Sequence, residues 1–524
     1  MSAGVPAYEP ARHARTGFPQ LVQAEWTKLR TVRSWMVTAV LAALVLVLFS
    51  WLTSNGIHAG VCTGPPPGNC HGEPPLPVGP DGEAVADSYY FVHQPLTGDA
   101  TITTRVTALT GAVSTEGNAV RAGTNPFSMS RAGLATWAKA GLLVTPSLKQ
   151  GTQYAAVMAT GGNGVRMQSD FTHDTAGMPG AVSATSPRWL RLTRSGDIIT
   201  GSDSTDGVNW TTVSTARLHD LPATVQVGLF VTSPVTSHNG FGPGHSTYAT
   251  AGFDHVSVDA PSTGTWVGTN IGGGPGYQTL ARGHFQRTAT GYTVGGSGDI
   301  APAVAGNGAS GGPATLGLVG AFAALIVVAI LGALFMTSEY RRGLIRTTFT
   351  ATPHRGRVLA AKALVLAAAT FVPAVIGAVV ATAVSRHVLS KNGNALFPLS
   401  GLTELRVVVG IGGLIAVTSA LALAVATLTR RSSPAVIAVV ATTVVPYILA
   451  LTLSGSIGSW LLRVTPAAGF AVQQSLTRYH QVANSYLPVN GYYPLAPWAG
   501  FAVLCGWTLL ALGAAGWLLR RRDA

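Results

Sequence analysis

The stretch that decides the fold is VVVGIGGLIAVTSALALAVATL at residues 407–428, which contains no Asp, Glu, Lys or Arg. A helix needs about 20 apolar residues to cross the hydrocarbon core of a bilayer. The buried helices of water-soluble domains are usually shorter, and a polar stripe runs along them. Residues 407–428 therefore predict a membrane-spanning helix.

Five further stretches meet the same criterion without a charged residue: 34–52, 314–336, 364–384, 434–453 and 496–519. They explain why 47% of the 524 residues are hydrophobic and only 10% are charged, against about 25% in an ordinary soluble domain. The first stretch is too long for the core of a secretion signal and lacks a small-residue cleavage site, so it predicts an uncleaved anchor. We expect one span, a hydrophilic region at 53–313, and five spans within 314–524.

Lys and Arg residues lie unevenly about these stretches. If the chain starts in the cytoplasm, 16 of them flank the spans on the cytoplasmic side and 5 lie in the short outer loops. Because Lys and Arg beside spans stay in the cytoplasm, we expect a multi-pass protein of the plasma membrane with both termini cytoplasmic. The outer region holds 12 Lys and Arg but 15 Asp and Glu. The net charge of +13 is therefore a topology signal, and no nucleic-acid partner is expected.

The tail at residues 1–33 ends in an amphipathic segment. Its apolar residues recur at helical spacing: Phe18, Val22, Trp26 and Leu29. Its polar residues fall on the other faces: Gln20, Gln23, Glu25, Lys28 and Arg30. The pattern predicts a helix in the membrane interface with Trp26 at headgroup depth. A simple anchor and a functional contact both explain it.

The loop at residues 338–357 begins with SEYRRGLIRTT. Ser338 is suited to cap a helix whose first turn carries Glu339, and Pro353 would end that helix. A short capped helix suits docking against another protein. A solvated basic loop that only enforces topology explains the same residues.

This loop also carries a family resemblance, through EYR at 339–341, Gly343, RTT at 346–348 and RGRVLAAK at 355–362. Together with residues 25–35, 462–470 and 492–498, it resembles the exporter-class (type 2) ABC transporter permeases of actinobacteria. The resemblance implies a coupling helix at 339–348 seated in a separate ATPase, with an elbow helix at 21–30 beside it. It also implies short re-entrant helices within 454–495 and a homodimer or heterodimer of permeases.

The resemblance assigns roles to two sets of residues. The implied ATPase-coupling residues are Glu339, Tyr340, Arg341, Gly343, Arg346 and Thr347. The implied elbow residues are Glu25, Trp26, Lys28 and Arg30. The 261-residue outer region departs from the family pattern, which has only a short first outer loop, and this departure leaves the substrate open.

The chain has no nucleotide-binding loop of its own, since no Gly is followed by Lys as the motif G-x-x-x-x-G-K-[ST] requires. Spans without ionisable residues also argue against a proton-coupled transporter. We therefore expect no catalytic residue and no cofactor here, with ATP used by the partner subunit. Small residues such as Gly513 and Gly516 allow close contact between spans.

The outer region predicts a β-sandwich at about residues 86–260. Short alternating segments separated by turn residues lie at 100–106, 140–144, 189–194, 225–231 and 253–258. Asp206-Gly207 fits a hairpin turn between two segments. WAKAGL at 137–142, WLRLTRSG at 189–196 and STDGVNW at 204–210 resemble the concanavalin A-like (laminin G-like) jelly-roll modules. Residues 265–302 hold a further β element whose role is open.

Three tryptophans of the sandwich are candidates for glycan contact, namely Trp137, Trp189 and Trp210, although core packing explains them better. Asp203, Asp206 and Asn209 lie close together but miss the spacing of a calcium loop, so turn chemistry is favoured and no metal site is expected. Cys62 and Cys70 lie outside the membrane, where a disulfide is permitted.

The sequence thus predicts six transmembrane helices with an inserted all-β extracellular sandwich. The function it favours is an exporter permease, driven by a separate ATPase, for an amphiphilic cargo. The alternative is a membrane-anchored surface receptor or adhesin whose sandwich binds envelope glycan.

Overall fold

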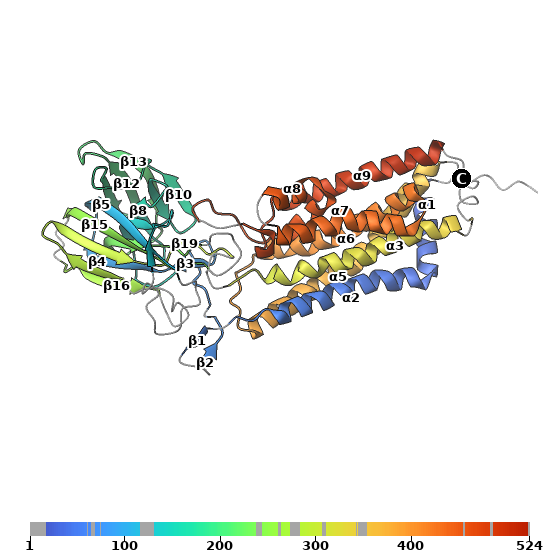
Figure 1. Ribbon diagram of the computed structural model, residues 1–524, viewed down its shortest axis with the longest axis horizontal. Helices are drawn as coiled ribbons and strands as arrows, with labels where there is room; N and C mark the ends of the chain where they lie inside the picture. The colour runs from blue at the N-terminus through green and yellow to red at the C-terminus, as the bar shows by residue number, and fades with distance from the viewer. Residues whose placement is uncertain are drawn as a thin grey trace, which may run out of the picture.

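The structure is a computed structural model with two parts, a helical bundle and a β-sandwich (Figure 1). It describes residues 17–59, 61–63, 69–73, 75–115, 130–236, 244–259, 264–272, 283–305, 311–341, 343, 354–453, 456–482 and 486–521. The C-terminus and helix α1 (Phe18–Thr31) lie at the end of the bundle away from the sandwich. We call this end the terminal end.

Six helical segments of the described chain are long and apolar enough to cross a membrane, and they confirm the six predicted spans. The helices are α2 (Arg33–Gly56), α3 (Ala321–Arg341) with the 3-10 turn η1 (Ala314–Gly320) before it, α5 (Arg355–Lys391), α6 (Gly401–Thr429), α7 (Ser432–Thr452) and α9 (Pro497–Arg521). The opening stretch lies in α6, which is the most buried span and contacts α3, α5, α7 and α9. Its apolar character on all sides follows from this central position.

Short helices lie between α7 and α9, as the resemblance implied. They are α8 (Ser456–Val464), η2 (Pro466–Gln473) and η3 (Pro488–Asn490). The η2 segment is buried throughout and packs against α6 and α9. The ring of Phe470 in η2 stacks on the ring of Tyr447 in α7, with 3.8 Å between the ring centroids. This part of the chain thus enters the bundle from the sandwich side.

Two antiparallel sheets form the sandwich. The first orders β10 (His173–Ala176), β9 (Val165–Ser169), β8 (Ala155–Thr160), β7 (Lys139–Thr145), β14 (Thr224–Thr232), β4 (Tyr89–Thr97) and β16 (Val267–Ile271). The second orders β13 (Thr211–Arg217), β12 (Ile198–Ser204), β11 (Arg188–Ser195), β5 (Ala100–Ser114), β15 (Thr247–Asp259), β18 (Gly291–Gly296) and β17 (His284–Arg287), with β6 (Ser130–Ala132) beside β5. All five predicted strands are present, and the Asp206-Gly207 turn joins β12 to β13.

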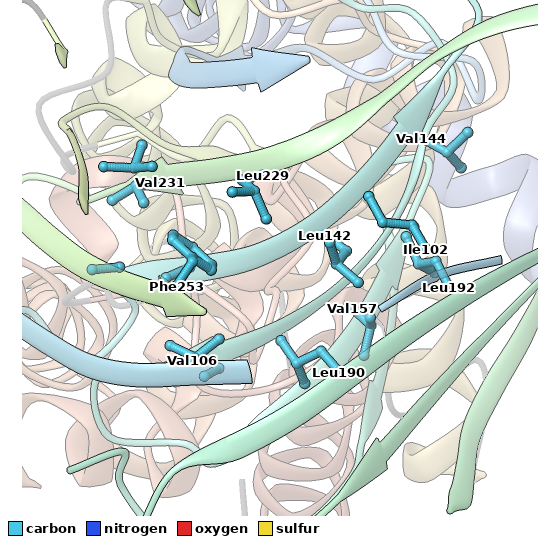
Figure 2. Close-up of a cluster of buried hydrophobic side chains, with 14 of the residues drawn as sticks. Ile102, Val106, Leu142, Val144, Val157, Leu190, Leu192, Leu229, Val231 and Phe253 are labelled. Carbon is cyan, nitrogen blue, oxygen red and sulfur yellow. The ribbon is translucent and has the colours of Figure 1, made fainter. Parts of the chain in front are cut away.

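The core of the sandwich lies between the two sheets (Figure 2). Along β11, buried residues alternate with partly exposed ones, as a strand with one face on the core requires. Leu190 and Leu192 of β11 face Leu142 of β7 and Val157 of β8 across the gap between the sheets. Burial of these aliphatic side chains stabilises the domain by roughly 1.5–3 kcal/mol each.

The sandwich extends past the predicted end at residue 260, because β16, β17 and β18 add strands to both sheets. The chain enters and leaves the domain through a two-stranded stem, in which β3 (Val85–Asp87) pairs with β19 (Ile300–Pro302). A small hairpin of β1 (Val61–Thr63) and β2 (Asn69–His71) precedes the stem. The further β element at 265–302 is therefore part of the sandwich and its stem.

The sandwich contacts the bundle loops that lie at its own end of the bundle, through a set of contacts that we call the outer joint. Gln481 is buried, and its Nε2 donates to the carbonyl oxygens of Phe171 at 3.3 Å and Thr172 at 3.2 Å. The hydroxyl of Tyr492 accepts from the backbone N–H of Ala305 at 3.3 Å. Apolar side chains from the stem and the loops pack around these contacts, among them Val304. The domain is thus seated on the segment between α8 and α9.

Candidate functional site

A cluster of four charged residues joins three helices at the terminal end of the bundle. Lys362 of α5 is 1% exposed, and its Nζ donates to Glu25 Oε2 of α1 at 2.7 Å. The same Nζ donates to Glu339 Oε1 of α3 at 2.5 Å. Lys28 of α1 completes the cluster, with its Nζ 2.9 Å from Glu25 Oε1 and 3.6 Å from Glu339 Oε1. We call these four residues the helix junction.

The electrostatics of the helix junction are balanced, because two carboxylates face two ammonium groups. Partial burial lowers the pKa of Lys28, but hydrogen bonding to Glu25 and the charges of Glu25 and Glu339 outweigh it, so the pKa is raised. Glu25 is 4% exposed and Glu339 is 9% exposed. A buried charge without its partner is costly, so Glu25, Glu339 and Lys362 depend on one another.

One oxygen of the junction has no hydrogen-bond partner within the described part of the chain. This oxygen is Glu339 Oε2, which is buried. The hydroxyl group of the neighbouring Tyr340 is also buried and also has no partner among the described residues. The ring of Tyr340 lies 5.7 Å from the guanidinium of Arg430, while Arg341 and Gly343 are exposed. The accessible surface next to the junction therefore belongs to Arg341 and Gly343, not to Glu339.

The predicted capped helix of the loop is wrong at its start. Ser338, Glu339, Tyr340 and Arg341 form the last turn of α3, and Ser338 Oγ donates back to Phe335 O at 3.2 Å. Ser338 caps nothing there because α3 continues past the last apolar residue of the span. The loop between α3 and α5 is therefore shorter than the predicted 338–357. Arg346 and Thr347, like Pro353, lie outside the described residues.

A helix is present at the predicted place, as α1, and its role as an elbow stays a prediction. The amphipathic pattern predicts Glu25 on a polar face, which is wrong, because the structure buries it together with Leu29. The reason is Lys362, which gives the carboxylate an ionic partner inside the protein. Trp26 is 38% exposed, and Lys28 and Arg30 also reach the surface.

Lys362 is the member of the helix junction that the sequence analysis does not single out. Its charge suits a basic loop, whereas the structure places it two turns inside α5, between buried Ala361 and Ala363. The signal in the sequence was one Lys embedded in an apolar run, together with a lone Glu at the end of the preceding span. A charge placed so requires a buried counter-charge.

The three candidate tryptophans of the sandwich do not share an exposed face. Trp137 is 8% exposed, so its ring belongs to the core. The guanidinium of Arg105 lies 5.5 Å from the ring of Trp189, and that of Arg191 lies 3.7 Å from the ring of Trp210. Glycan contact at Trp189 and Trp210 stays a prediction.

The acidic turn of the sandwich behaves as a turn. Asp206 Oδ1 accepts from the N–H groups of Val208 and Asn209, each at 2.8 Å, and these bonds hold the pKa of Asp206 well below its usual range. Asp203 accepts from the N–H of Met178 at 2.6 Å. In the small hairpin the backbones of Cys62 and Cys70 are paired, and their disulfide stays a prediction.

These features define a class of protein: a multi-pass membrane protein with six spans, an inserted β-sandwich and a charged junction at the terminal end. The family model of the ABC-2 family transporter proteins matches residues 21–524, and the chain belongs to that family. The match spans the sandwich as well as the helices. No curated protein matches this chain.

Solved structures resemble only part of the chain. A functionally unknown protein from Saccharomyces cerevisiae is 17% identical, with a TM-score of 0.22. The match covers 37% of this chain and 85% of that protein. Scytalido-glutamic peptidase, bound to a transition state analog inhibitor, is 10% identical, with a TM-score of 0.25, over 40% and 98%. Lectin I-B4 from Griffonia simplicifolia is 12% identical, with a TM-score of 0.16, over 39% and 92%. TM-scores this low support no conclusion about the fold or the function of this chain.

Proposed function

We propose that the chain is the permease subunit of an ATP-driven exporter and that a separate ABC ATPase binds the terminal end of its bundle. Permeases of the ABC-2 family generally work with such an ATPase. The sequence has no nucleotide-binding loop, which agrees with a subunit that carries out no catalysis and uses ATP through a partner. The excess of Lys and Arg at this end favours a cytoplasmic location for both termini.

The helix junction is the observation that carries this proposal. Glu339 lies two residues before the end of α3, and Lys362 lies seven residues after the start of α5, so the junction spans both ends of the loop. Through Glu25 it also holds α1. A displacement of the end of α3 or the start of α5 would therefore act on all three helices. In this account Glu339 is a positioning residue, and contact with the ATPase falls to exposed residues such as Arg341.

The experiment co-expresses the chain with the ATPase of a neighbouring reading frame and measures ATP turnover in lipid nanodiscs. We expect the wild-type permease to change the turnover of the ATPase. Lys362→Met should retain ATPase binding but remove this change, because α1 is no longer tied to α5. Glu339→Gln should reduce the change, because α3 is then held less tightly to α5. Arg357→Met is the matched control, since Arg357 lies on the same helix but is exposed.

Two outcomes would contradict the proposal. In one, the wild-type chain neither co-elutes with the ATPase nor alters its turnover. In the other, the full chain binds a defined glycan on an array without any ATPase partner, which would favour the receptor or adhesin. A permease dimer and an amphiphilic cargo rest on the family resemblance, and crosslinking in native membranes tests the dimer.

A further inference from the structure

A groove of about 440 Å³ runs between the start of α5 and the end of α9. Its walls are mostly apolar, with Leu359 and Ala360 on α5 and Leu509 and Leu512 on α9. The volume falls within the range of roughly 300–1,000 Å³ that is usual for sites of small ligands. Nothing in the proposed coupling to an ATPase accounts for this groove.

Missing side chains create the groove. Gly513 and Gly516 of α9 line it, and a Cβ atom added at either would meet no atom within 4 Å. Small residues in spans usually let two helices approach closely. Here no described atom fills the space where the side chains of these two glycines would lie, so this space forms part of the groove. The α9 span is also the least buried of the six candidate spans.

The end of the groove near the chain terminus is cationic. Arg520 lines it, and Arg520 Nη2 lies 3.7 Å from where a Cβ of Gly356 would be. Among the residues that the structure describes, no carboxylate pairs with Arg520. Trp517 forms the adjacent wall, and the guanidinium of Arg521 lies 4.2 Å from its ring centroid. Tryptophan and arginine at this depth are typical of the headgroup layer.

We propose that this groove binds an anionic phospholipid from the leaflet on the terminal side. One acyl chain lies along Gly513 and Gly516, and the phosphate lies at the guanidinium of Arg520. An apolar channel that ends at a cation matches an amphiphile with a negatively charged headgroup. The lipid replaces the missing helix contact and fills the gap between α5 and α9. The inference does not depend on the proposed coupling to an ATPase.

The test uses the full chain in detergent and measures binding of phosphatidylglycerol and of phosphatidylcholine with the same acyl chains, by native mass spectrometry. We expect the wild-type chain to prefer phosphatidylglycerol. Gly513→Leu fills the channel and should abolish the tight binding. Gly506→Leu is the matched control, because Gly506 lies on the same helix, has no neighbour within 4 Å and does not line the groove.

The headgroup contact is tested separately with Arg520→Gln. Loss of one cation near a lipid surface is worth about 1 kcal/mol, so phosphatidylglycerol should bind roughly fivefold more weakly while phosphatidylcholine is unchanged. Arg431→Gln is the control, since Arg431 is an exposed cation in the short turn between α6 and α7.

Three results would overturn the proposal. Wild-type chain could bind both lipids equally, or Gly506→Leu could lose as much binding as Gly513→Leu. Gly513→Leu could instead leave lipid binding unchanged and alter the oligomeric state, which would assign the groove to a second copy of the chain. An ATPase that fails to co-elute with wild type would contradict the proposed function alone.

Discussion

The two ends of the bundle are joined to their neighbours in different ways. At the helix junction, charged side chains meet one another at 2.5–2.9 Å in an apolar surrounding. At the outer joint, Gln481 and Tyr492 bond to backbone groups, and apolar side chains pack around them. The first joint depends on single charges, whereas the second spreads its contacts over many atoms. A single substitution should therefore weaken the first joint more than the second.

Lys362→Met should have the largest effect on stability. It leaves the carboxylates of Glu25 and Glu339 buried without their main partner, which destabilises by about 3–5 kcal/mol. The measurement is the unfolding midpoint of the full chain in detergent. Arg357→Met, the exposed control on α5, should change the free energy by less than about 0.5 kcal/mol. Equal midpoints for the two variants would show that the junction does not stabilise the bundle.

The stem of the outer joint should respond to pH. Burial raises the pKa of Asp87 to about 7, against one hydrogen bond from the N–H of Gly151 that lowers it. The folded stem therefore holds a proton that the unfolded chain releases near pH 4, so stability should fall as pH rises from about 4 to 7, by up to about 4 kcal/mol.

The check is amide exchange in β3 and β19 of the full chain, compared at pH 5 and pH 8 after correction for intrinsic exchange rates. Asp87→Asn should remove the pH dependence of this protection. A wild-type stem that is equally protected at both values would contradict the prediction.

Gln481→Ala should have the smallest of these effects. It leaves two carbonyl oxygens, of Phe171 and Thr172, without their side-chain donor, at a cost of about 1–3 kcal/mol. Hydrogen exchange should increase in the turn between β9 and β10 while the helices are unchanged. If Gln481→Ala lowered the stability as much as Lys362→Met does, the outer joint would depend on one residue and not on many contacts.

The sequence predicted what local pattern determines. Residues 407–428 are apolar on every side, so they predict a span without any knowledge of its neighbours, and the alternation in 189–194 predicts the strand β11 in the same way. The local pattern places Glu25 on a polar face and does not reveal its burial, because its partner Lys362 is 337 residues away in the chain. The residue type of Ser338 favours a helix cap, but α3 continues through this residue to Arg341.

The central claim is that an ATPase binds the terminal end of this permease, and photo-crosslinking tests it most directly. A benzophenone amino acid replaces exposed Arg341 at the end of α3, or exposed Leu402 at the sandwich end of α6. In cells that also make the neighbouring ATPase, position 341 should crosslink to the ATPase and position 402 should not. Crosslinking at neither position, or only at 402, would contradict the account.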